Sequence, residues 1–238
     1  MDESARLLNL NVGVLGHVDS GKTSLVKALS THLSTAALDK HPQSQQRGIT
    51  LDLGFSAFVL EMPDHLKSQM ATDDEYTHLQ FTLVDCPGHA SLIRTIIGGA
   101  QIIDLMVLVV DAVKGMQMQT GECLVVGELT TDRLVVALNK TDLLPPGAER
   151  EPALARAVAR VQRALRGTRF AGCPVVPLAA AAGGEKVAAV GKTKGKGAGK
   201  GPSTTAEPQG VDRLVGVLLG AARLPDRGLG GPGPAAAA

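Results

Sequence analysis

The chain has 238 residues and a net charge of +1, with 24 Lys and Arg against 23 Asp and Glu. This length can bury a substantial core in one or two domains, and the balanced charge neither favours nor excludes a nucleic-acid partner. No apolar run reaches the length of a membrane span, and the N-terminus lacks the apolar core of a secretory signal. Three widely spaced cysteines, Cys86, Cys123 and Cys173, predict reduced thiols in a cytoplasmic protein rather than a disulfide framework or zinc site.

Apolar and amphipathic segments alternate along the chain. The pattern predicts strands at residues 9–15, 51–60, 79–84, 105–111, 134–139 and 173–178, and helices at residues 22–32, 91–97, 117–129, 149–167 and 211–224. Most of the strand segments are continuous Val/Leu/Ile runs, as in strands covered on both faces. Segment 51–60 instead alternates, with Leu51, Leu53, Phe55, Ala57 and Val59 on one face, as in an edge strand. We therefore expect an α/β fold of the P-loop GTPase type, with a mainly parallel, doubly wound, six-stranded sheet.

A phosphate-binding loop follows the first strand. Residues 16–23 read GHVDSGKT, a full match to G-x-x-x-x-G-K-[ST] between a predicted strand and a predicted helix. The two glycines let backbone N–H groups converge on a phosphate, and the helix N-terminus adds to the attraction. Lys22 can reach the β- and γ-phosphates, and the Thr23 hydroxyl can ligate Mg²⁺. The predicted phosphate-binding residues are Gly16, His17, Val18, Asp19, Ser20, Gly21, Lys22, Thr23 and Ser24.

Two further motifs predict contacts with the metal and the γ-phosphate. Strand 79–84 ends in the sequence DCPGH, which places the Asp85 carboxylate near the metal and lets the Gly88 N–H face the γ-phosphate. The polar sequence RGIT ends at Thr50, just before strand 51–60, and its hydroxyl can reach Mg²⁺ when GTP is bound. Such a loop would order with GTP and relax after hydrolysis.

A fourth motif predicts which base is bound. Strand 134–139 ends in Asn139, Lys140, Thr141 and Asp142, an N-K-x-D sequence. The Asp142 carboxylate can accept hydrogen bonds from N1–H and the 2-amino group of guanine, which adenine cannot supply. Lys140 would lie along the base and Asn139 would brace the neighbouring loops. The sequence therefore predicts GTP rather than ATP.

The composition changes after residue 178. Residues 183–210 are rich in Gly, Lys, Ser, Thr and Pro, which predicts a disordered insertion, and residues 225–238 predict a disordered Gly/Pro/Ala tail. Between them, residues 211–224 have helical spacing. We therefore expect one GTP-binding domain over residues 1–224.

The four motifs, in this order, resemble the GTPase domain of translational GTPases of the elongation factor Tu class. The segments around RGITLDLGFSAF, and the run from TLVDCPGH through GMQMQTGECL, resemble the selenocysteine-specific elongation factors of eukaryotes and archaea. The resemblance covers about residues 9–178. It implies GTP hydrolysis to GDP, Mg²⁺, and delivery of selenocysteinyl-tRNA to the ribosome at recoded UGA codons, by a monomer without a membrane partner.

The resemblance also implies residue roles. Lys22, Thr50 and His89 would be catalytic, with His89 positioning the attacking water behind an apolar gate of Val18 and Ile49. Thr23, Thr50 and Asp85 would hold the metal, and Asp19 would help hold a monovalent cation. Ala179 and Ala180 stand in the fifth guanine-binding motif without its usual serine, which predicts a modest loss of affinity; the Ala180 N–H can still face guanine O6.

Two alternatives remain open at the level of sequence. Family members continue into β-barrel domains that bind the tRNA, and we expect none in this chain, so it can also act as an isolated GTP-binding module. Another translational GTPase, such as the initiation factor γ subunit, is the second alternative; LDLGFSAF and the polar insertion at residues 62–77 favour the selenocysteine-specific type.

Overall fold

The computed structural model describes residues 6–37, 55–70, 76–85, 103–181 and 207–224. The strands are β1 (Arg6–Gly16), β2 (Phe55–Glu61), β3 (Tyr76–Asp85), β4 (Leu105–Asp111), β5 (Leu134–Asn139) and β6 (Val175–Pro177). The helices are α1 (Lys22–Ala37), α2 (Asp64–Lys67), α4 (Met118–Thr130), α5 (Arg150–Leu165) and α6 (Val211–Ala221), with short 3-10 turns η2 (Thr141–Leu143) and η3 (Gly147–Glu149). The predicted helix at residues 91–97 lies outside the described residues.

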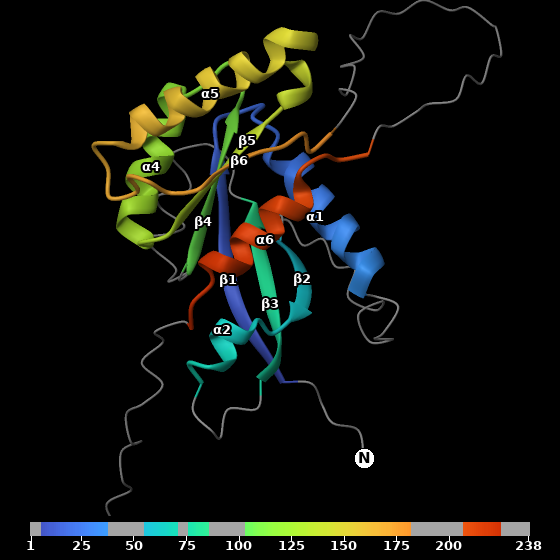
Figure 1. The fold of residues 1–238 in the computed structure, drawn as a ribbon. Helices are drawn as coiled ribbons and strands as arrows, with labels where there is room; N and C mark the ends of the chain where they lie inside the picture. The colour runs from blue at the N-terminus through green and yellow to red at the C-terminus, as the bar shows by residue number, and fades with distance from the viewer. Residues whose placement is uncertain (1–5, 38–54, 71–75, 86–102, 182–206, 225–238) are drawn as a thin grey trace, which may run out of the picture.

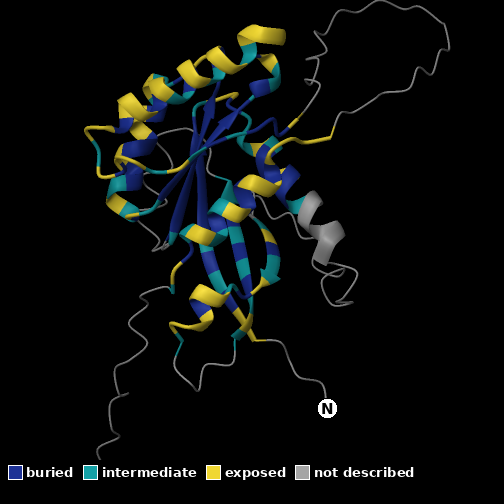
Figure 2. Cartoon of the chain, viewed as in Figure 1, coloured by how far each residue is buried: buried dark blue, intermediate teal, exposed yellow. Residues whose placement is uncertain are grey.

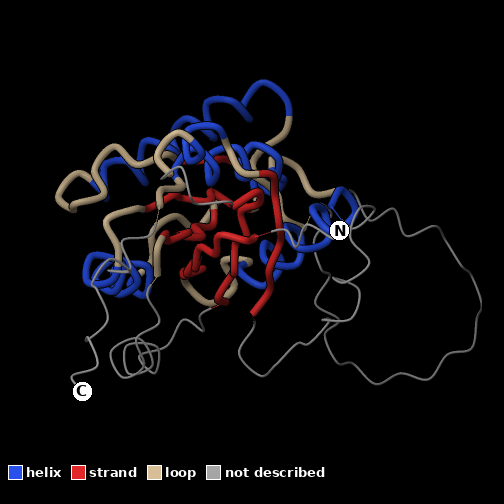
Figure 3. The backbone as a smooth tube through the Cα atoms, turned by 90° about the horizontal axis from the view of Figure 1, so that it is seen from below, coloured by secondary structure: helices blue, strands red, loops and turns tan. Residues whose placement is uncertain are grey.

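In the described part of the chain, the strands form one six-stranded sheet in the order β2-β3-β1-β4-β5-β6. β2 runs antiparallel to β3, and every other neighbouring pair is parallel. Figure 3 shows the strands as a central layer with helices on both sides. The predicted mainly parallel sheet, with the second strand at its edge, is confirmed. None of the described helices is long and apolar enough to cross a membrane.

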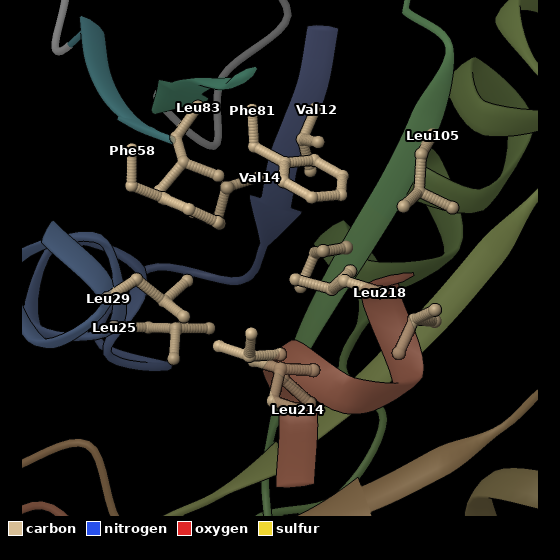
Figure 4. Close-up of a cluster of buried hydrophobic side chains, with 14 of the residues drawn as sticks. Val12, Val14, Leu25, Leu29, Phe58, Phe81, Leu83, Leu105, Leu214 and Leu218 are labelled. Atoms are coloured by element: carbon tan, nitrogen blue, oxygen red, sulfur yellow. The ribbon is translucent and has the colours of Figure 1, made fainter. Parts of the chain in front are cut away.

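One face of the sheet is covered by α1 and α6 (Figure 1). β1 and β3 turn alternate residues toward these helices, and Leu25 and Leu29 of α1 meet Leu214 and Leu218 of α6 over them (Figure 4). The spacing of three and four residues on each helix is what places these side chains on one face. The helix predicted after the linker therefore completes the domain.

The other face of the sheet is covered by α4 and α5. Ala153, Ala157, Val161 and Leu165 recur every four residues along α5 and are all buried in one apolar cluster with residues of β4 and β5. β4 and β5 are buried along their whole length, and the outward side of α5 is exposed (Figure 2). A strand covered on both faces explains the continuous apolar runs seen in the sequence.

The edge strand β2 turns Phe58 toward the core. Phe58 is buried opposite Phe81 of β3, with ring centroids 5.2 Å apart, whereas Ala57 is exposed. Antiparallel pairing with β3 places Phe58 and Leu60 on the α1 side, so Ala57 and Val59, which the sequence placed together on one face, lie on the other side of the strand.

A short helix, α2, lies between β2 and β3 and was not predicted. Leu66 of α2 and the preceding Met62 are buried in the same core as α1 and α6. The imidazole Nε2 of His65 lies 3.2 Å from the carbonyl oxygen of Ala222, at the end of α6. The segment between β2 and β3 therefore packs against the core and contacts the residue that follows α6.

The end of the segment predicted as a linker belongs to the domain. Gln209 pairs with Ala179 through two backbone hydrogen bonds of 3.0 Å, and Gly210 then caps α6. Gly210 has φ +77°, and a Cβ there would lie 2.7 Å from the carbonyl oxygen of Pro177. Glycine is required for this close approach of α6 to the end of β6.

Candidate functional site

The predicted functional side chains meet at the carboxyl edge of the sheet. β1 ends at Gly16, β3 at Asp85, β4 at Asp111 and β5 at Asn139. Parallel strands deliver their carboxyl ends to the same edge, where ligands of such sheets bind. The structure thus brings together the phosphate loop, the strand that ends in Asp85 and the N-K-x-D sequence.

The phosphate loop is a close-fitting turn into α1. Gly21 has φ +92°, and a Cβ there would overlap the carboxamide nitrogen of Asn139. A Cβ on Gly16 would overlap the carbonyl oxygen of Val109 in β4. Both glycines are therefore required by neighbouring strands as well as by the turn itself.

The interior of the phosphate loop has the polar groups that an anion needs. The Lys22 ammonium donates to the carbonyl oxygens of Gly16 and His17, each at 3.0 Å, so it lies across the loop. His17 Nδ1 and the Ser20 hydroxyl are buried and have no hydrogen-bond partner within the described residues. Buried polar groups without partners are uncommon, and a bound phosphate would satisfy such groups. The loop and the N-terminus of α1 therefore fit a nucleotide phosphate.

The two described residues predicted to hold Mg²⁺ lie side by side. The exposed Thr23 hydroxyl donates to Oδ2 of Asp85 over 2.8 Å, across 62 residues of sequence. A hydroxyl and a carboxylate are oxygen ligands of the kind that Mg²⁺ prefers, and Mg²⁺ sites are usually completed by phosphates and water. The pair therefore fits the predicted metal.

Asn139 braces the two loops on either side of it. Its carboxamide nitrogen donates to the carbonyl oxygen of Ser20 over 3.0 Å, and its Oδ1 accepts the Ala180 N–H over 2.9 Å. This matches the bracing role predicted from the sequence. Because the Ala180 N–H is bonded to Asn139 here, its contact with guanine O6 stays a prediction.

Lys140 joins the base loop to the phosphate loop. It adopts a left-handed backbone with φ +63°, and its ammonium donates to the carbonyl oxygen of Asp19, which has φ +60°. The same ammonium lies 3.1 Å from Oδ2 of Asp111. Burial raises the pKa of the Asp111 carboxyl, but the Lys114 N–H and the Lys140 ammonium outweigh it and lower the pKa overall. Asp111 is therefore ionised at neutral pH.

Helix α4 supports the phosphate loop from the side. Oε1 of Gln119 accepts the N–H of Val18 over 3.2 Å. One turn later, burial raises the pKa of the Cys123 thiol, although the Gly16 N–H and the Lys22 charge oppose the rise. Cys123 and Cys173 are both free thiols, as predicted. Cys123 is therefore a neutral packing residue beneath the loop.

Sequence reasoning missed Asp111 and Gln119. Asp111 could have been found, because it is a polar residue at the end of a buried strand, in the same position as Asp85 and Asn139. No local pattern marks Gln119, since its partner Val18 is 101 residues away.

Of the remaining predicted site residues, some lie within the described part of the chain and others do not. Ser24 lies in the first turn of α1, half-buried Asp142 lies in η2, and Ala179 and Ala180 are buried after β6. The side chains and backbone of Ile49, Thr50, Gly88 and His89 lie outside the described residues.

Comparison with known families decides the class of this fold. Residues 8–218 match the family described as the elongation factor Tu GTP binding domain. The match spans nearly all of the described residues. The chain belongs to this family. The elongation factor Tu GTP-binding domain is a GTPase domain, and the doubly wound sheet with its phosphate loop is the corresponding fold.

Within this family the chain is similar to selenocysteine-specific elongation factors. It is 52% identical over 229 residues to the factor of Mus musculus, covering 96% of this chain and 36% of the mouse protein. It is 49% identical over 140 residues to the factor of Methanocaldococcus jannaschii, covering 59% of this chain and 26% of the archaeal protein. The matched part of the chain thus spans about a quarter to a third of the length of these relatives. The translation initiation factor 2 γ subunit of Haloarcula marismortui is 36% identical over 183 residues, covering 72% of this chain and 42% of that subunit.

A solved structure supports the same fold. The apo form of translation elongation factor SelB from Methanococcus maripaludis matches with a TM-score of 0.50 and 30% identity, covering 73% of this chain and 30% of that chain. The predictions of a P-loop GTPase fold and of a selenocysteine-specific type of sequence are therefore confirmed.

Proposed function

We propose that this chain is the GTP-hydrolysing domain of an elongation factor that delivers selenocysteinyl-tRNA to the ribosome at recoded UGA codons. The observation that carries the proposal is the 52% identity to a selenocysteine-specific elongation factor across 96% of the chain. The geometry of the site is consistent with it, because Asn139 and Lys140 tie a base loop to a phosphate loop.

The proposed nucleotide contacts follow the strand ends. Gly16 through Ser24 would bind the phosphates of GTP and GDP, with Lys22 neutralising charge on the β- and γ-phosphates. Asn139, Lys140 and Asp142 would select guanine, with Ala179 and Ala180 closing the base pocket. The two buried polar atoms without partners in the phosphate loop support this assignment.

The proposed metal ligands are Thr23, Asp85 and Thr50, the last of which lies outside the described residues. Bound Mg²⁺ would neutralise charge that develops on the phosphates. The 2.8 Å contact between Thr23 and Asp85 supports a site at this position. Asp19 is exposed and has a left-handed backbone conformation in the phosphate loop. The proposal includes a monovalent cation held beside it.

In the proposed mechanism, water attacks the γ-phosphate in line with the leaving oxygen. Lys22 and the loop N–H groups would stabilise the developing charge, and His89 would orient the water behind the gate of Val18 and Ile49. Val18 is 40% exposed and its N–H is held by Gln119, so its side chain is available at the loop surface. Without the ribosome, hydrolysis is expected at about 10⁻⁴ s⁻¹, as in small GTPases without an activator.

The decisive experiment is the variant His89→Ala, measured for GTP binding and for GTP hydrolysis with and without ribosomes. We expect unchanged GTP affinity and loss of the ribosome-stimulated rate. Ribosome stimulation of the variant at the level of the parent chain would contradict the assignment of His89.

A second candidate is a GTP-binding module that binds no tRNA. It is favoured because every motif found in the chain is assigned to the nucleotide, the metal or the attacking water, and none to a tRNA. Binding of selenocysteinyl-tRNA and of an elongator tRNA, each with GTP, separates the candidates. Selective binding of selenocysteinyl-tRNA supports delivery by this chain, equal binding favours an elongation or initiation factor of broader specificity, and no binding favours the module.

The proposed elongation factor domain would act as a monomer in the cytoplasm.

A further inference from the structure

A buried carboxylate outside the predicted motifs faces the base loop. Asp111 is the last residue of β4 and is 5% exposed. The register of the sheet places it directly beside Asn139, the last residue of β5, so Lys140, which follows β5, lies within reach. A charge buried to this extent must be paired, and Lys140 pairs it at 3.1 Å.

The two oxygens of Asp111 have separate partners. Oδ1 accepts the backbone N–H groups of Val113 at 2.9 Å and Lys114 at 3.0 Å, which closes the turn after β4. Oδ2 faces the Lys140 ammonium. The turn therefore fixes the carboxylate, and the carboxylate fixes the position of the ammonium.

The ammonium that Asp111 holds also donates to the phosphate loop. Lys140 and its acceptor Asp19 are the two non-glycine residues with positive φ in the described part of the chain. Such backbone conformations persist where the surroundings enforce them. The contact between Lys140 and Asp19 thus joins two strained turns, and Asp111 is the charged group that supports it from below.

We propose that Asp111 is a positioning residue for the guanine nucleotide. By holding the Lys140 ammonium against the carbonyl oxygen of Asp19, it keeps the base loop and the phosphate loop at the separation that a bound nucleotide spans, and it slows nucleotide release. This inference rests on the proposed assignment of the two loops as the base and phosphate sites. A nucleotide bridging both loops leaves more slowly when the loops cannot separate.

The test is the release rate of a fluorescent GDP analogue from the full chain. The variant Asp111→Asn keeps the Oδ1 acceptor for the Val113 and Lys114 N–H groups but places an amide NH₂ against the ammonium. We expect release about tenfold to a hundredfold faster, the factor that corresponds to a lost hydrogen bond to a charged group. Asp132→Asn is the matched control, because it removes an exposed carboxylate paired with Arg133 at 3.5 Å, and its release rate should equal that of the parent chain.

A second comparison separates positioning from a general effect on folding. In a background of Lys140→Gln, adding Asp111→Asn should not accelerate release further, because the ammonium on which Asp111 acts is gone. Parent-like release from Asp111→Asn, or full acceleration that persists in the Lys140→Gln background, would overturn the inference. A parent chain that binds no GDP would overturn the proposed function as well, whereas a parent that binds GDP with parent-like release from Asp111→Asn would overturn the role of Asp111 alone.

Discussion

The loop between β1 and α1 closes on its own atoms and is held from outside by the side chains of Gln119, Asn139 and Lys140, whereas the loop after β5 is anchored to the backbone of the segment after β6. In the phosphate loop, Ser20 N–H donates to His17 and the Lys22 ammonium spans Gly16 and His17. In the base loop, the backbone and hydroxyl of Thr141 both donate to the carbonyl oxygen of Leu178, 37 residues away.

This difference shows where a sequence change will be felt. A locally closed loop is damaged by changes within its own motif. The base loop additionally depends on Asp111, on the segment after β6 and, through Ala179, on Gln209 beyond the linker. Changes at these remote positions should therefore alter nucleotide binding without touching a motif residue.

The largest effect is expected where the two loops touch. Gly21→Ala would place a Cβ against the carboxamide of Asn139 at a residue with φ +92°. Both the collision and the strained backbone oppose the folded loop, so GDP affinity should fall by about 100-fold or more, measured by isothermal titration calorimetry. Gly167→Ala is the control, because nothing lies within 4 Å of a Cβ there. Equal GDP affinities of Gly21→Ala and Gly167→Ala would contradict the need for close contact between Gly21 and Asn139.

The next effect is expected from Asn139, which connects both loops. Asn139→Ala leaves the carbonyl oxygen of Ser20 and the buried Ala180 N–H without their partners. Loss of these bonds loosens both loops, and we expect GDP to bind roughly tenfold to a hundredfold more weakly, the equivalent of about 1.4–2.7 kcal/mol. Asn139→Asp keeps the acceptor for Ala180 but places a carboxylate oxygen against the carbonyl oxygen of Ser20 at a buried position, so its GDP affinity should be no higher than that of Asn139→Ala. A parent-like affinity of Asn139→Asp would contradict the role of the donor to Ser20.

A smaller effect is expected at Gly210, where α6 begins after the segment predicted to be disordered. Gly210→Ala forces a Cβ toward the carbonyl oxygen of Pro177 at φ +77°, which should lower the free energy of unfolding by about 1–3 kcal/mol. The matched control is Gly216→Ala, exposed within α6 with nothing near its Cβ; it should raise the free energy of unfolding by up to about 1 kcal/mol. Urea unfolding of both variants measures the difference. An increase in the free energy of unfolding for Gly210→Ala, as for Gly216→Ala, would contradict the close contact between Gly210 and the end of β6.

The smallest effect concerns the thiol of Cys173, just before β6, at the opposite edge of the sheet from the base loop. Burial raises the pKa of Cys173 to about 11, so the neutral thiol favours the folded state. Its stabilisation is fully present below the unfolded pKa of about 8.5 and is lost as the pH rises through about 11. With Cys86 and Cys123 replaced by serine, alkylation of Cys173 at pH 8 should be at least about tenfold slower in the folded protein than in urea, because the reactive species is the thiolate. Equal rates would show that the folded structure does not bury the Cys173 thiol.

Much of the fold followed from local patterns. The predicted bounds of β4 and β5 agree with the structure residue for residue, because strands covered on both faces are unbroken apolar runs. For β2 the sequence predicted an edge strand but not which face is buried, since the buried face of an edge strand depends on its partner. No pattern predicted α2, because it is a single turn held by burial of Leu66 rather than by its own periodicity. The predicted contributions of Thr50 and His89 lie outside the described residues and stay predictions.

The sequence by itself determined the phosphate loop, the base motif and the class of fold, because these depend on glycine spacing, residue type and strand ends that are close together in the chain. The tertiary structure decided how the two loops are joined. Asp111 meets Lys140 because β4 and β5 pair in one register, and Gln209 meets Ala179 because α6 packs onto the same core as α1. Contacts between residues far apart in sequence are set by the register and packing of whole elements, which no short motif encodes.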